Sequence, residues 1–164
     1  MISKIDTHFP VYVGELGLKE KHSLWLKRLY YDHLTLSPFS EDKKSVLYRD
    51  SDPFEGIFTK FQEASKDFFS SRPVKIKSMW TTIFEKEGFH SCHTHPQTDW
   101  TFSYYLDAEG QKGGAVRFFW EGKVLEISPK TGDFMLLPGN LPHEVTANKL
   151  STRVLISFNL NHVT

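Results

Sequence analysis

The chain has 164 residues, of which 39% are hydrophobic and 15% aromatic, a length and composition that predict one globular domain with a sizeable core. Its 20 Lys and Arg balance 20 Asp and Glu, and neither sign forms a long run, which argues against nucleic-acid or polybasic membrane binding. No apolar run approaches the roughly 20 residues that span a bilayer, the N-terminus lacks the apolar stretch of a secretory signal, and the single Cys92 cannot form a disulfide within the chain, so we expect a cytoplasmic protein.

The first 72 residues have helix-like periodicity. A helix is expected over residues 19–33, and a more regular one follows Asp52. Asp52 can cap this second helix, Pro53 falls at its first position, and the carboxylate of Glu55 can reach back to the cap. Its apolar face, at three- and four-residue spacing, comprises Phe54, Ile57, Phe58, Phe61, Ala64 and Phe68. We therefore expect residues 1–72 to form an N-terminal helical support.

From Pro73 onward the chain has the pattern of short strands, rich in β-branched and aromatic residues and separated by Gly, Pro, Asn or Asp. The predicted strands are residues 75–85, 100–106, 115–120, 123–128, 133–138, 143–147 and 152–160. Such a succession predicts an antiparallel sandwich or barrel over residues 73–164, with the Phe-rich helix covering one face. We expect a mainly β (α+β) fold in which residues 1–164 form a single domain.

Histidines gather at two places in this β region. His93 and His95 lie two residues apart at the mouth of a predicted strand, so we expect their side chains to point to the same face. His143 begins another strand after the turn PGNLP. Three imidazoles could bind one iron, zinc, copper or nickel ion and leave coordination positions open. The alternative is that one or two of them are ordinary half-buried strand residues.

Four blocks of sequence carry a family resemblance: GFHSCHTHPQTDWTFSYYL, GGAVRFFW, PKTGDFMLLPGNLPHEV and TRVLISFNL. In order and approximate spacing they resemble the 2-oxoglutarate- and Fe(II)-dependent oxygenases, in particular a group whose metal motif reads His-x-His-Pro. The resemblance covers about residues 79–160. It implies a double-stranded β-helix, a jelly-roll or cupin-like barrel whose mouth holds iron.

The resemblance also implies a ligand set. His93 resembles the first metal ligand and His143 the distal one, while His95 stands where most relatives carry Asp or Glu. An imidazole cancels neither charge of Fe(II), so a three-His site depends more on an anionic co-ligand such as 2-oxoglutarate. Asp99 could supply the carboxylate instead, although it would need a bulge to swing back, or only two protein ligands could bind.

Arg153 resembles the residue that takes the distal carboxylate of 2-oxoglutarate, which a planar and permanently charged fork holds well. Tyr105 resembles the tyrosine that bonds the same carboxylate, and by alternation Tyr104 faces the other side of its strand. A core role for either tyrosine is the alternative. Arg117, on an earlier strand, is the rival anchor.

The resemblance therefore implies a hydroxylase of an unknown substrate, with Fe(II) on His93, His95 and His143 and with 2-oxoglutarate as co-substrate. A cupin-type dioxygenase or isomerase without 2-oxoglutarate, or a non-catalytic binding barrel, is the alternative. We expect no nucleic-acid or membrane partner, and a homo-oligomer stays open. Since ligation needs neutral imidazoles, whose ordinary pKa is about 6.5, we expect iron to be lost as the pH falls below roughly 6.

Overall fold

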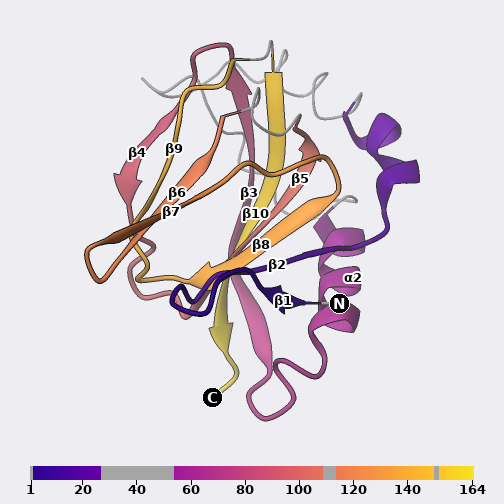
Figure 1. Cartoon of the computed structure of the whole chain (residues 1–164). Helices are drawn as coiled ribbons and strands as arrows, with labels where there is room; N and C mark the ends of the chain where they lie inside the picture. Colours follow the sequence, from indigo (N-terminus) through magenta and orange to yellow (C-terminus); the bar gives the residue numbers. More distant parts are fainter. Residues whose placement is uncertain (1, 27–53, 109–113, 150–151) are drawn as a thin grey trace.

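Two antiparallel sheets face each other, and helices cover the outer face of the larger one (Figure 1). The computed structural model describes residues 2–26, 54–108, 114–149 and 152–164. The six-stranded sheet has the order β1 (Ser3–Lys4), β2 (Tyr12–Glu15), β8 (Asp133–Pro138), β5 (Trp100–Asp107), β10 (Thr152–His162) and β3 (Val74–Glu85). The four-stranded sheet has the order β4 (His90–His93), β9 (His143–Val145), β6 (Val116–Trp120) and β7 (Lys123–Ile127). This is the double-stranded β-helix that the family resemblance implied, in a mainly β chain.

All seven predicted strands are present, with small differences at their ends. The expectation of an N-terminal helical support over residues 1–72 did not include the two short strands β1 and β2 that lie in this range. Strand β2 joins the larger sheet beside β8, with Val13 opposite Met135. A strand of four residues is too short for its alternation to stand out in a sequence, and its pairing here covers an edge of β8 that would otherwise expose backbone donors and acceptors.

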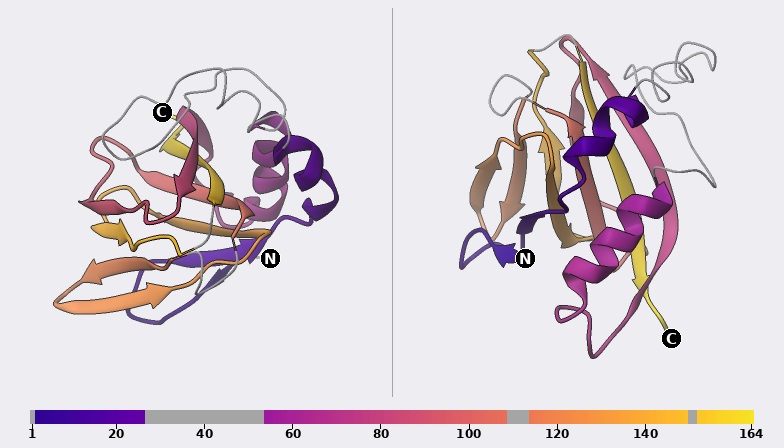
Figure 2. Two further views of the ribbon diagram at one scale, coloured as in Figure 1. Left: turned by 90° about the horizontal axis from the view of Figure 1, so that it is seen from above. Right: turned by 90° about the vertical axis from the view of Figure 1, so that its right-hand side faces the viewer.

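Helix α2 (Phe54–Ser65) packs against the larger sheet, as Figure 2 shows from two sides. Residues 19–26 are also helical. The proposed capping residues Asp52 and Pro53, and residues 27–33 of the first predicted helix, lie outside the described residues. Phe68 is not on α2, because the helix ends at Ser65. It lies in the following turn, where its ring contacts Tyr12, with 4.7 Å between the ring centroids.

Strand β10 separates two environments because alternate side chains point to opposite faces of a sheet. Val154, Ile156 and Phe158 are buried in the core that includes α2. Arg153 and Leu155 are buried on the other face, between the two sheets. The larger sheet therefore has one face built for packing and one that lines a cavity.

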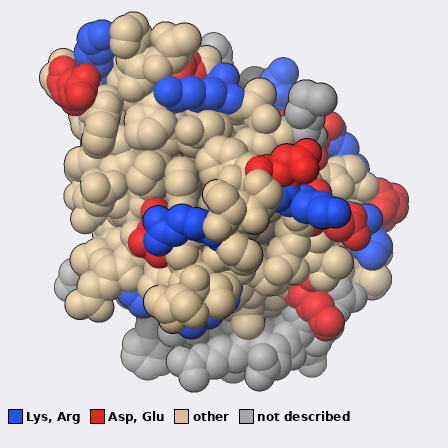
Figure 3. Space-filling model, turned by 90° about the horizontal axis from the view of Figure 1, so that it is seen from below, with Lys and Arg blue, Asp and Glu red and all other residues tan. Residues whose placement is uncertain are grey.

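The surface carries charges of both signs. On the face shown in Figure 3, the blue and red side chains are interspersed among uncharged residues. No described helix combines the length and the apolar character needed to cross a lipid bilayer.

Candidate metal centre

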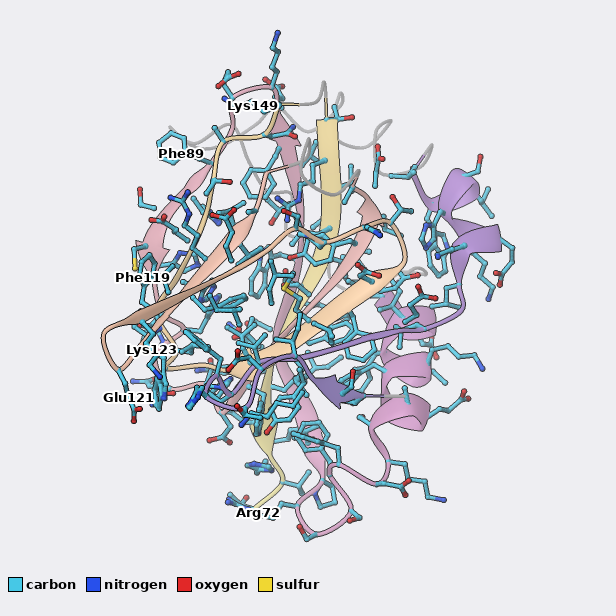
Figure 4. The ribbon with its side chains drawn as sticks, viewed as in Figure 1. Arg72, Phe89, Phe119, Glu121, Lys123 and Lys149 are labelled. Atoms are coloured by element: carbon cyan, nitrogen blue, oxygen red, sulfur yellow. The ribbon has the colours of Figure 1, made fainter. Side chains whose placement is uncertain are left out.

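A cross-strand pair of histidines lines the cavity between the two sheets. In the pairing of β4 with β9, His93 lies directly opposite His143, and their ring centroids are 4.5 Å apart. The register of β4 shifts between His90 and His93. Phe89, labelled in Figure 4 just before β4, is 53% exposed. The chain therefore turns from an exposed residue to a cavity-lining histidine within a few positions.

His95 reaches the same place from a loop rather than from a strand, because β4 ends at His93. Its backbone N–H donates to the carbonyl of Gly139 at 2.7 Å, and the N–H of Gly139 donates to the carbonyl of Asp99 at 3.0 Å. A Cβ atom on Gly139 would collide with the carbonyl oxygen of Thr98 and lie 3.0 Å from that of His95. Because Gly139 has no side chain, the turn PGNLP can approach the loop that carries His95. The hydrogen bonds between them hold this loop beside His143.

The three histidines fit a metal ion. One ring nitrogen from each of His93, His95 and His143 lies within 4.8 Å of the other two. The Nδ1 atoms of His93 and His143 lie 2.7 and 2.9 Å from the carbonyl oxygens of Ser91 and Leu141. A carbonyl can only accept, so each Nδ1 carries the proton and each Nε2 of the neutral ring keeps its lone pair for a metal. This arrangement is typical of metal-ligating histidines.

Burial keeps two of these rings neutral. The pKa of His95 is lowered to about 3, first by burial and then by the neighbouring His143, His93 and His90. The pKa of His143 is lowered to about 4, mainly by burial and further by His93, although the hydrogen bond to Leu141 opposes the shift. The expectation that protons displace iron near pH 6 rested on ordinary imidazoles. In the folded chain His95 and His143 stay ready for a metal well below that pH.

Arg153 and Tyr105 line the same cavity from β10 and β5. Arg153 is only 1% exposed, and its Nη1 donates to the carbonyl of Gly114 at 3.3 Å. Its guanidinium carbon lies 5.0 Å from the centre of the Tyr105 ring, and the Tyr105 hydroxyl lies 3.9 Å from the sulfur of Met135. Burial lowers the pKa of Arg153 and raises that of Tyr105, while each partner opposes the shift of the other. Arg153 nevertheless remains a buried cation, because the guanidinium does not lose its proton in proteins.

The cavity has a volume of about 70 Å³. Its lining includes Trp80, whose ring stacks on His95 with 5.8 Å between the centroids. The polar residues lining it are Thr82, His90, His93, His95, Thr101, Ser103, Tyr105, His143, Arg153 and Ser157. The apolar and aromatic ones are Trp80, Phe84, Val116, Phe118, Met135, Leu137, Val145 and Leu155. Within the described parts of the chain, the lining contains neither Asp nor Glu.

The alternative candidates from the sequence, Asp99, Arg117 and Tyr104, lie outside the cavity. Asp99 is exposed, and its carboxylate accepts a hydrogen bond from the backbone N–H of His162 at 2.8 Å. Arg117 is also exposed, with its Nε 2.7 Å from a carboxylate oxygen of Glu126. Tyr104 points to the helix side of β5, where its hydroxyl lies 2.7 Å from Nε2 of His22. None of the three lines the cavity.

Sequence reasoning missed the hydroxyl groups that flank Arg153 and Tyr105. Ser103 and Ser157 line the cavity, and their hydroxyl oxygens lie 2.9 Å apart. Both could have been found by alternation, since Ser103 is two residues before Tyr105 and Ser157 is four after Arg153. The single cysteine, Cys92, is exposed.

Neither a comparison with models of protein families nor one with curated proteins found a match for this chain. Solved structures do match. A viral collagen prolyl hydroxylase from Paramecium bursaria Chlorella virus 1, in complex with 2-oxoglutarate, superposes with a TM-score of 0.71 at 12% identity, over 98% of this chain and 100% of that one. A prolyl-4-hydroxylase from Pseudomonas putida gives 0.71 at 14% identity, over 93% and 92% of the two chains.

HygX from Streptomyces hygroscopicus, solved with nickel and 2-oxoglutarate bound, gives a TM-score of 0.73 at 11% identity, over 94% of this chain and 83% of that one. These likenesses extend over nearly the whole chain, whereas the sequence resemblance covered only part of it. At such low identities they bear on the fold. The chain has the double-stranded β-helix fold of the Fe(II)- and 2-oxoglutarate-dependent oxygenases.

Proposed function

We propose that this protein is an Fe(II)- and 2-oxoglutarate-dependent oxygenase that hydroxylates a substrate still to be identified. His93, His95 and His143 would hold the metal, and Arg153 with Tyr105 would hold the distal carboxylate of 2-oxoglutarate. One observation carries the proposal: three convergent imidazoles and a buried arginine line one cavity between the sheets. The shared fold supports it.

Metal binding requires that each histidine ring is neutral and that its unprotonated nitrogen faces the metal. The hydrogen bonds from Nδ1 of His93 and His143 to backbone carbonyls set the tautomer, and burial keeps His95 and His143 unprotonated. When bound, iron and 2-oxoglutarate supply the oxidising power for hydroxylation by O2, with 2-oxoglutarate leaving as succinate and CO2. The chain supplies orientation and a site shielded from bulk water.

Arg153 suits the role of anion anchor. Its guanidinium presents several donors in a rigid plane, and a carboxylate can accept two of them at once. Burial disfavours the charged form of Arg153 and so costs free energy. Binding of a dicarboxylate would offset that cost. The Tyr105 hydroxyl, on the same wall of the cavity, can donate to the same carboxylate.

The test is an anaerobic titration of metal-stripped protein with Fe(II) and then 2-oxoglutarate, followed by the visible metal-to-ligand charge-transfer band. We expect the band in wild type. Arg153→Met keeps the aliphatic stem but removes the charge, and it should weaken 2-oxoglutarate at least about 30-fold, as expected for loss of one partner of a buried charge pair. Arg117→Met is the matched control and should titrate like wild type, because Arg117 is exposed on the outside.

Equal 2-oxoglutarate affinity in wild type and Arg153→Met would contradict the anchor. Iron binding without a band would favour the cupin-type enzyme, and no iron binding at all would favour a non-catalytic barrel. The single-domain organisation of residues 1–164, the cytoplasmic setting and a homo-oligomer stay predictions.

A further inference from the structure

The three proposed ligands differ in the contacts that hold their rings. In His93 and His143, Nδ1 donates to a backbone carbonyl, and this hydrogen bond fixes the rotation of the ring. Among the residues that the structure describes, no hydrogen bond to a ring nitrogen of His95 occurs. The His95 ring instead contacts other rings, those of Trp80, His93 and His143. His95 therefore needs another means of keeping a nitrogen turned toward a metal.

Trp80 lies on β3, on the side of the larger sheet that faces this ring. Alternate residues of β3 point to opposite sides, so Ile83 is buried in the core that includes α2, whereas Trp80 and Thr82 line the cavity. The indole of Trp80 stacks on the His95 ring, with 5.8 Å between the centroids and 24° between the planes. A residue of the larger sheet thus contacts a ligand that a loop supplies.

Two side chains of the larger sheet hold the loop that carries His95. Nζ of Lys77 on β3 donates to the carbonyl of Gln97 at 2.6 Å, and Nδ2 of Asn161 on β10 donates to the same oxygen at 3.3 Å. These bonds restrain the backbone of the loop, but they leave rotation about the side-chain bonds of His95 open. The stacked Trp80 ring restricts that rotation.

Trp80 differs from the other two rings that contact His95. His93 and His143 are themselves proposed ligands and would turn toward the same metal. The indole N–H of Trp80 can only donate a hydrogen bond, so this residue does not ligate a metal. Stacking of two aromatic rings changes the population of one side-chain conformer by roughly two- to tenfold. The contact is therefore strong enough to matter for metal affinity.

We propose that Trp80 is a positioning residue of the metal centre, which holds the His95 ring in the orientation that binds the metal. This inference rests on the proposed function above, because it takes His95 to be a metal ligand. Trp80 restrains the rotation of His95 as the backbone carbonyls restrain His93 and His143. Position 80 then has to supply an aromatic face rather than a polar group.

Metal affinity of variants at position 80 tests this role. Metal-free protein is titrated with Co(II), which resists oxidation by air, and the visible absorption of the complex reports binding. We expect Trp80→Leu to bind Co(II) at least about tenfold more weakly than wild type, whereas Trp80→Phe, which keeps an aromatic face, stays within about threefold. Trp120→Leu is the matched control and should bind like wild type, because Trp120 packs beside the core and does not line the cavity.

A double-mutant cycle shows whether Trp80 acts through His95. His95→Ala already lacks the ring that Trp80 would hold. Adding Trp80→Leu to this variant should therefore weaken Co(II) binding by less than about threefold. A further loss of about tenfold would show that Trp80 acts elsewhere and would overturn the proposal.

Equal Co(II) affinity in wild type and Trp80→Leu also overturns the role of Trp80, and so does a Trp80→Phe variant that binds as weakly as Trp80→Leu. Trp80→Met, which is also apolar but not aromatic, has the same expectation and takes the place of Trp80→Leu if that variant does not fold. Failure of wild type to bind Co(II) would contradict the ligand set of the proposed function, and the role of Trp80 with it.

Discussion

The two faces of the larger sheet bury different kinds of side chain, although the same strands form both faces. Toward α2 the sheet presents a nearly continuous apolar layer that includes Phe102, Phe134, Ile156 and Phe158. Toward the smaller sheet the alternate residues of these strands include Arg153, which is also buried. The first face gains stability from packing. The second face also packs apolar residues, Met135, Leu137 and Leu155 among them, but it buries polar groups beside them at a cost in stability. The difference lies in these polar groups, which suit a binding site.

The helix face also buries a pair of polar side chains. His22 and Tyr104 are both buried there, and Nε2 of His22 lies 2.7 Å from the tyrosine hydroxyl. Since this hydroxyl has a partner, its burial costs little. The cavity face differs because its polar groups converge on a space that a metal and an anion could fill.

The largest expected effect comes from breaking the packing face. Phe61 of α2 is fully buried, and its ring centroid lies 4.4 Å from that of Phe102. Phe61→Ala should lower the free energy of unfolding by about 3 to 5 kcal/mol, from lost burial and the cavity left behind. Urea denaturation measures it, with Lys60→Ala on the exposed side of the helix as control. A loss no greater than that of the control would show that α2 is not part of the core.

Breaking the cavity face should affect binding more than folding. His143→Ala removes one of the three proposed ligands, so Fe(II) affinity should fall at least about 100-fold, more than is usual for loss of an outer hydrogen-bond partner. The metal-free variant should lose less stability than Phe61→Ala, because His143 contributes polar rather than apolar burial. Metal titration and urea denaturation of the same sample test both points. Unchanged iron affinity would remove His143 from the ligand set.

The pH dependence of the stability of the metal-free protein gives a further test of the difference between the two faces of the sheet. In the fold the pKa of His143 is about 4 and that of His95 about 3, whereas the unfolded chain takes up these protons near its ordinary value of about 6.5. The unfolded state binds more protons in this interval, so stability falls as the pH drops from about 6.5 to about 4, by a few kcal/mol.

His143→Gln should make this pH dependence shallower, because one of the rings with a lowered pKa is removed. Urea midpoints at several pH values measure the slope. His22 contributes in the same direction, since burial is also the main cause of its lowered pKa. An identical slope in His143→Gln and wild type would mean that His143 does not set it.

The smallest effect is expected on the outer surface of the smaller sheet. Arg117 is 45% exposed and pairs there with Glu126 and Glu144. Exposed ion pairs contribute little because water and salt screen them. Arg117→Ala should therefore leave the thermal midpoint and the 2-oxoglutarate affinity unchanged. Weakened 2-oxoglutarate binding in this variant would restore Arg117 as the rival anchor.

Much of this could be predicted from the sequence because it depends on local periodicity. Alternation located the strands and separated Tyr105 from Tyr104, and helical spacing located α2. The residue types and the family resemblance together singled out His93, His143 and Arg153 as candidates. Strand β2 was missed because four residues carry too little pattern, and its pairing with β8 joins segments far apart in the chain.

The sequence by itself determined the mainly β fold, the apolar helix and the set of candidate ligands, since each follows from neighbouring residues. Only the tertiary structure placed His95, and not Asp99, beside His93 and His143, because this placement depends on the contact of Gly139 with the loop that carries both residues. It also decided that the lining holds no carboxylate in the described chain, since Glu144 turns outward to Arg117. Burial and charge at a site are sums over distant segments, and only the folded chain brings those segments together.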